Sequence, residues 1–147
     1  MTVHTLYEKD VVAWSSEQTT LLRSGKFSEI DLEKISEKIE DVGKSEQREL
    51  ASSMSLLIAY LLKWKYQPSH RGTSWEKNIK AQRKEILYTL KESPSLKTKF
   101  SDPDWTDVIW SKGVAVASTE AGLAVFPDQP EWSVAQILDS DFWPLAC

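Results

Sequence analysis

The sequence has little cysteine, histidine or glycine, and each shortage excludes a class of site. Its one cysteine, Cys147, is the last residue, so no disulfide can form within the chain and a frayed terminal thiol is expected. Neither His4 nor His70 follows a glutamate by three positions, so zinc spacings and the Glu-x-x-His pairs of di-iron bundles are missing. The five glycines are scattered and form no phosphate-binding loop. We therefore expect neither a metal nor a cofactor.

Long apolar runs are also missing. The longest run, 56–62, is far shorter than the roughly 20 residues that span a bilayer. Charged residues follow soon after Met1, so the N-terminus lacks the apolar stretch of a signal peptide. No Gly-x-Ser-x-Gly elbow is present to support a hydrolytic triad. These absences predict a cytoplasmic protein without a membrane segment.

What the sequence does contain is apolar residues at helical spacing. With no alternating pattern and no hairpin signal, it predicts an all-α fold, a bundle of four main helices with an additional short C-terminal helix, in one domain over residues 1–147. The expected helices span about 5–24, 31–65, 73–93, 104–124 and 133–138.

Turn and capping residues set the expected boundaries. Gly25 can close the first helix in a left-handed conformation, and Ser28 or Asp31 can cap the second. A hydroxyl three residues before a carboxylate or amide has the capping-box form, which occurs at 73–76 and 133–136. The fourth helix is expected to open at Asp102-Pro103-Asp104 and to end at 126–127.

Several apolar residues are expected to face the core. The second helix carries Ile39 and Val42 in its apolar series, and the third carries Leu87 beside residues 79, 86 and 90. On the fourth helix, small residues recur at every fourth position (113, 117 and 121), which would let another backbone approach closely. The segment 142–144 is expected to fold onto the core as an apolar tail.

The second helix is too long for a compact domain of this size. Unbroken, it would extend ~50 Å, against a radius of gyration of ~15 Å for a compact chain of this length. Either Gly43 breaks or bends it, or a partner covers it, most simply a second copy of the chain in a homodimer.

Charge is strongly segregated along the chain. Residues 63–100 carry ten Lys and Arg against three Asp and Glu, whereas residues 101–147 carry one against eight. A basic segment that also holds aromatic residues is what an anion-binding or nucleic-acid-binding surface would contain. The alternative is that the basic third helix packs beside the acidic fourth helix and the two neutralise one another.

The basic segment holds a corner between two helices that is rich in Trp, Tyr and Arg, the residue types that dominate protein interfaces. We therefore expect a non-enzymatic protein-interaction module with an unknown protein partner. An anion or nucleic-acid binder through 63–100 is the alternative. Trp64, Trp75, Trp105 and Trp110 provide another option, since such residues form either the core or the lining of a small-molecule pocket. The candidate binding residues of the corner are Tyr60, Lys63, Trp64, Tyr66, Arg71, Trp75 and Arg83.

A polar cluster is the third candidate. Glu37 and Glu40 lie one helical turn apart, and beside Glu120 and Arg83 they would suit proton transfer in an enzyme of unknown class. The alternative is that they are solvated or pair with nearby lysines on their own helix.

The order of several motifs resembles the bacterial "domain of unknown function 29" family. The motifs are Leu6-Tyr7 with Asp10 and Trp14, 36–40, 60–68, Ser74-Trp75, Gln82-Arg83, 93–97, Glu120 and Phe126-Pro127. The resemblance implies a small, mainly helical bacterial protein with no assigned activity. It also implies two departures, because the family usually has histidine at the position of Tyr60 and glutamate at that of Lys38. A site in relatives that depended on either residue would be altered here.

Overall fold

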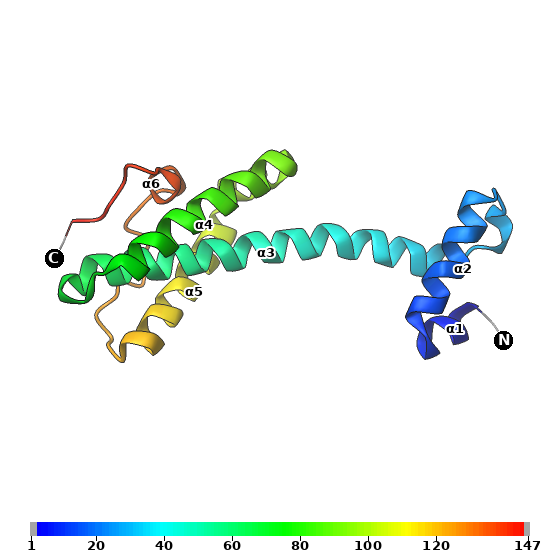
Figure 1. The fold of residues 1–147 in the computed structure, drawn as a ribbon, viewed down its shortest axis with the longest axis horizontal. Helices are drawn as coiled ribbons and strands as arrows, with labels where there is room; N and C mark the ends of the chain where they lie inside the picture. Colours follow the sequence, from blue (N-terminus) through cyan, green and yellow to red (C-terminus); the bar gives the residue numbers. More distant parts are fainter. Residues whose placement is uncertain (1–2, 146–147) are drawn as a thin grey trace. The chain divides into compact units, whose positions relative to one another are not determined.

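The computed structural model describes residues 3–145, and within that range every regular element is helical. The predicted all-α class, with four main helices and a short C-terminal helix, is confirmed. Figure 1 shows the helices, which are α1 (Val3–Lys9), α2 (Val11–Arg23), α3 (Leu32–Tyr66), α4 (Thr73–Glu92), α5 (Pro103–Ala121) and α6 (Val134–Leu138). Short 3-10 turns lie at η1 (Phe27–Glu29), η2 (Pro68–His70) and η3 (Pro94–Ser101). Cys147 lies outside the described residues.

The chain divides into two compact units, Met1–Glu46 and Gln47–Cys147, called unit 1 and unit 2 below. One domain over residues 1–147 stays a prediction. None of the helices within residues 3–145 has the length and apolar character needed to cross a membrane.

The predicted first helix, 5–24, is wrong in one respect because it is two helices. Asp10 takes an extended conformation, and its side chain accepts a hydrogen bond from the Ala13 amide, which caps α2. An aspartate at this position offers the backbone an alternative to a continuous helix. Gly25 has a positive φ of 73° and closes α2 as expected.

Unit 1 is held by a small set of contacts between its helices. Tyr7 meets Trp14 edge to face, with ring centroids 5.0 Å apart. The buried Gln18 side chain accepts a hydrogen bond of 2.7 Å from the Asp31 amide. The Asp31 carboxylate in turn accepts a hydrogen bond from the Lys34 amide at 3.2 Å. Asp31, rather than Ser28, therefore caps the N-terminus of α3.

The helix α3 runs without interruption through Gly43, so of the alternatives given for its length, a break at Gly43 is wrong. Nothing lies within 4 Å of where a Gly43 side chain would begin, and a glycine in a helix costs only about 0.5–1 kcal/mol. Ile39 and Val42 are 70% and 65% exposed. The expectation that they face a core is therefore wrong in this chain.

On α4 the inward-facing stripe differs from the predicted one. Its buried members are Ile79, Arg83, Ile86 and Leu90, whereas Leu87 is 50% exposed. Arg83 occupies the position one turn before Ile86, so the stripe turns Leu87 outward. The predicted capping box at 73–76 is also wrong, because Gly72 takes the cap position and no side chain caps the helix.

The helix α5 packs closely on α3 at Gly113. A side chain there would begin 2.5 Å from Ile58 Cγ2 and 3.0 Å from the Ser55 carbonyl oxygen. Nearby, the Ser55 hydroxyl donates to the Ile109 carbonyl at 3.2 Å. This part of the predicted small-residue stripe thus lets two backbones approach within the chain. The helix ends at the left-handed Gly122, before the predicted stop at 126–127.

The core of unit 2 joins residues of α3, α4, α5 and α6. Its largest fully buried members include Leu57, Leu61, Ile86 and Trp110. The predicted capping box of Ser133 and Gln136 starts α6. Trp143 packs against this core, which confirms that the tail folds onto it.

Candidate functional site

The corner where α3 ends and α4 begins contains a buried lysine. Lys63 is 6% exposed, and its ammonium group is paired with the Glu120 carboxylate of α5. It also lies 4.6 Å from the ring centre of Tyr60 and 5.3 Å from that of Trp75 on α4. Since a buried ammonium is tolerated only when it is paired, this contact ties three helices together.

Two further cations of the corner, Arg71 and Arg83, hold the C-terminal segment. The Nε of Arg71 donates to the Trp64 carbonyl at 2.7 Å, and its guanidinium lies 4.8 Å from the Trp64 ring centre. Trp64 also contacts Trp143, whose ring lies 4.8 Å from that of Trp64. Arg71 also reaches the Pro144 carbonyl at 3.5 Å.

Arg83 is more deeply buried than Arg71 and holds the same C-terminal segment. Its Nε donates to the Ile137 carbonyl at 2.9 Å and its Nη2 to the Phe142 carbonyl at 2.7 Å. Burial lowers the pKa of Arg83, although the nearby charge of Asp139 opposes that shift. Charged donors form strong hydrogen bonds to carbonyls, so Arg83 fixes the chain on both sides of residues 138–141.

Tyr66 and Lys65, at the end of α3, share one carboxylate. Both donate to Glu131, and Tyr66 also meets Phe126 edge to face at 5.7 Å. Partial burial acts to raise the pKa of Glu131, but the hydrogen bonds from Lys65 and Tyr66 outweigh it and bring the pKa below its usual 4.5. These contacts attach the loop before α6 to α3.

All seven candidate binding residues of the corner therefore lie in unit 2, and each contacts other parts of that unit. None is classed as exposed. Lys63, Arg71 and Arg83 each direct polar atoms to partners within the chain, although the buried Nη1 of Arg83 has no hydrogen-bond partner among the described residues. Their role in binding a partner protein stays a prediction.

The predicted polar cluster is not assembled in either unit. Glu37 pairs with Lys34 at 3.5 Å, and Glu40 pairs with Lys44 at 3.6 Å, both on exposed parts of α3 in unit 1. In unit 2, Glu120 is paired with Lys63 rather than with Arg83. Within the described residues, no group of three or more His, Cys, Asp or Glu side chains is placed to hold a metal ion.

The two positions that depart from the family resemblance lie in different units. Lys38 is near Tyr7, with its nitrogen 5.2 Å from the ring centre, and hydrogen bonding to Tyr7 raises the pKa of Lys38. Tyr60 supplies one of the rings against Lys63.

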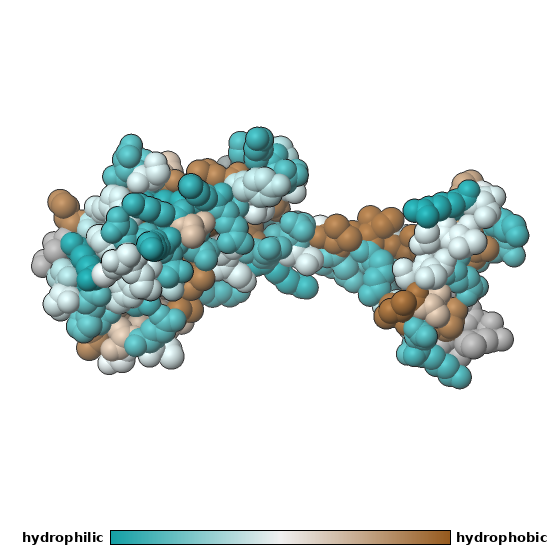
Figure 2. Space-filling model, in the orientation of Figure 1, coloured by the Kyte–Doolittle hydropathy of each residue, from teal (hydrophilic) through white to brown (hydrophobic). Residues whose placement is uncertain are grey.

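A basic surface on α4 was not singled out from the sequence. Lys77, Lys80 and Lys84 line a groove of about 480 Å³ together with Leu87 and, on the C-terminal segment, Ser140; Ala81 and Arg83 complete the lining. Figure 2 shows hydrophilic residues gathered over this part of unit 2. The available signal was the spacing of three and four between the lysines, which places them on one helix face.

This basic surface is not neutralised by α5. Lys80 pairs with Glu76 at 3.0 Å on its own helix, and Lys77 and Lys84 form no ion pair with the described part of the chain. The proposed neutralisation of the third helix by the fourth is therefore not found. The ion pairs that reach α5 and the following loop come from Lys63 and Lys65 of α3.

The fold and this surface define a small all-α protein whose conspicuous cations either clamp its own C-terminal segment or line a groove. A family model described as "Domain of unknown function DUF29" matches residues 6–143. The chain belongs to this family, as the resemblance of its motifs predicted. Comparison with curated proteins and with solved structures found no match.

Proposed function

We propose that the chain is a non-enzymatic binding module that takes an acidic, amphipathic segment of a partner protein on the basic face of α4. The observation that carries the proposal is the unneutralised charge of this face. Lys77 and Lys84 lie two turns apart and form no ion pair within the described residues. Such charges are available to steer and orient an acidic partner.

The groove beside these lysines supports an amphipathic partner rather than a purely charged one. Ala81 and Leu87 supply apolar surface, and the aliphatic stems of lysines add to it while their ammonium groups stay in water. A segment that alternates carboxylates with apolar side chains would satisfy both features. Recognition by an apolar groove with a charged rim is a common way to bind peptides.

The alternative partner, a nucleic acid, has less support. Base stacking needs free aromatic faces, but Trp64 contacts both Arg71 and Trp143, and Trp75 lies against Lys63. Tyr66 is engaged by Phe126 and Glu131. The aromatic residues that suggested stacking are therefore already packed inside unit 2.

The test is fluorescence anisotropy of a labelled acidic peptide with alternating Glu and Leu, compared with a labelled single-stranded oligonucleotide. We expect the full chain to bind the peptide, and the double variant Lys77→Glu with Lys84→Glu to bind at least about tenfold more weakly, a loss of ~1.4 kcal/mol. The matched control, Lys9→Glu with Lys26→Glu, makes the same charge change in unit 1 and should leave binding unchanged.

Two results would contradict the proposal. An equal loss in the control variant would show that only net charge matters. Tighter binding of the oligonucleotide, with an affinity that falls linearly in log salt, would show that phosphates are the partner.

A homodimer is a second candidate for the interaction, favoured by Ile39 and Val42. These two exposed residues are three positions apart on α3 and so share a helix face, where a second copy could cover them. Sedimentation velocity would then show a dimer that Ile39→Glu converts to a monomer. A monomeric native chain at high concentration would remove this candidate.

A further inference from the structure

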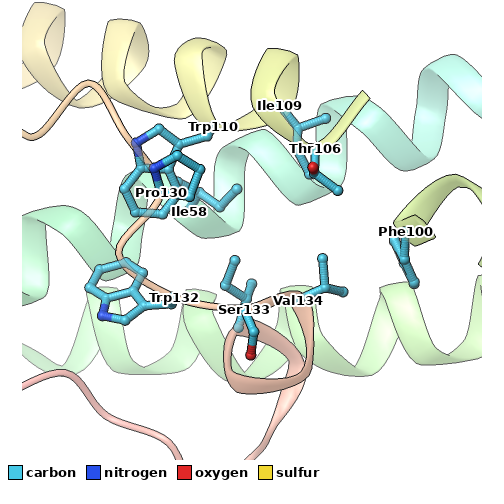
Figure 3. A pocket seen from close by; sticks show the side chains of 10 residues that line it. Ile58, Phe100, Thr106, Ile109, Trp110, Pro130, Trp132, Ser133 and Val134 are labelled. Atoms are coloured by element: carbon cyan, nitrogen blue, oxygen red, sulfur yellow. The ribbon is translucent and has the colours of Figure 1, made fainter. Parts of the chain in front are cut away.

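A separate feature of unit 2 is a cavity of about 200 Å³. It lies among α3, α5, η3 and the segment that leads into α6, as Figure 3 shows. Ile58 and Ile109 are fully buried in its wall, and Val134 lies across from Ile109 in the view. The cavity does not share a residue with the groove on α4, so it is independent of the proposed function.

The walls offer no charge and no free hydroxyl proton. Thr106 donates its hydroxyl proton to the Pro103 carbonyl at 3.0 Å. The Ser133 hydroxyl belongs to the capping box, where it donates to Gln136 Oε1 at 3.4 Å and accepts from the Gln136 amide. Because no side chain that lines the cavity is charged, an ionic ligand would lose its hydration without compensation.

Three aromatic side chains contribute to the lining. Trp110 and Trp132 meet edge to face, with centroids 5.4 Å apart and an interplanar angle of 69°. Phe100 lies at the other end of the cavity in Figure 3. The indole nitrogen of Trp110 is already used, since it donates to the Pro127 carbonyl at 2.9 Å. What Trp110 offers a ligand is therefore ring surface, which favours offset or edge-to-face contact with another ring.

We propose that this cavity binds a small, uncharged aromatic molecule. The size fits, because an apolar cavity of about 150 Å³ is already enough to hold benzene. An entry path lies at Pro130 and Ser133, which are exposed residues of the cavity wall. A single aromatic ring, or a fused pair of rings, therefore defines the ligand class.

The experiment uses the full chain with ¹³C-labelled isoleucine methyl groups and benzene as the probe. We expect saturable shifts of the Ile58 and Ile109 methyl signals with benzene, and none with benzoate at the same concentrations. Val134→Phe fills the cavity and should weaken benzene binding by about tenfold or more, because the added ring takes the space that benzene would occupy. Val108→Phe adds the same ring at a half-exposed position of α5 outside the cavity and should leave binding unchanged.

The proposal is overturned if benzene causes no saturable shift in the native chain, or if benzoate binds as well as benzene. It is also overturned if folded Val134→Phe binds benzene like the native chain, or if Val108→Phe weakens binding equally. Should Val134→Phe not fold, Thr106→Phe fills the same cavity from α5 and is read by the same criteria.

Discussion

Lys63 and Arg83 are the two buried cations of unit 2, and they act in different ways. Lys63 meets a carboxylate and two aromatic rings, so its charge is paired. Arg83 instead donates to two backbone carbonyls. Burial lowers the pKa of its guanidinium group. Buried charges of either kind must have partners, which explains why the most conspicuous residues of the corner face inward.

Gly113 is the residue where close packing is most sharply defined. Gly113→Ala should lower the free energy of unfolding by about 1–2 kcal/mol, because overpacking against Ile58 and the Ser55 carbonyl outweighs the better helix propensity of alanine. Urea unfolding followed by far-ultraviolet circular dichroism measures the change.

Gly43→Ala is the matched control for this prediction. Apart from the nearby backbone of its own helix, nothing lies within 4 Å of the new methyl group, so the helix propensity of alanine should act alone and raise stability by about 0.5–1 kcal/mol. Equal effects of the two substitutions would refute the assigned contact between α5 and α3.

Among the elements, α6 and the segment after it depend on contacts with other helices more than on the helical structure of α6 itself. The helix α6 has only five residues, and short helices are marginal by themselves. Two hydrogen bonds from Arg83 and the tilted ring contact of Trp143 with Trp64 hold the segment in place. The element is therefore fixed by tertiary contacts.

Arg83→Met tests this dependence because it keeps an apolar stem and removes both donors. It should lower the free energy of unfolding by about 3–6 kcal/mol, since the two lost hydrogen bonds come from a charged group and are worth roughly 1.5–3 kcal/mol each. Hydrogen–deuterium exchange should become faster across 137–144.

The exposed Arg48 provides the control, since Arg48→Met should change stability by less than about 0.5 kcal/mol. Unchanged exchange of 137–144 in Arg83→Met would show that Arg83 does not hold this segment.

At the scale of the whole molecule, the two units differ in how much core they contain. Every member of the main hydrophobic cluster lies at or after Leu50, in unit 2. Among the described side chains of unit 1, the buried ones are Trp14, Gln18 and Asp31. Small units bury a smaller share of their surface and are less stable.

A fragment of residues 47–147 should therefore fold alone. We expect it to keep a helical circular dichroism spectrum and a cooperative urea transition close to that of the full chain, whereas residues 1–46 alone should be largely unfolded. A fragment 47–147 without a cooperative transition would contradict this prediction and support one domain over 1–147.

Much of the fold could be predicted from local chemistry. Asp31, Gly25 and the pair Ser133 and Gln136 mark helix ends because their side chains or backbones satisfy groups beside them in the chain. The break at Asp10 and the end at Gly122 have the same kind of local cause, but the spacing of apolar residues predicted one helix through Asp10, and Phe126-Pro127 predicted a later stop.

The sites were less predictable, because they depend on which residues meet across long separations. The sequence itself determined the helical class, the basic character of 63–100 and the family, since these follow from composition, spacing and motif order. Only the tertiary structure decided that Lys63 pairs with Glu120 and that Arg83 holds the C-terminal segment. Those contacts join residues more than 50 positions apart, because only folding brings such distant side chains together.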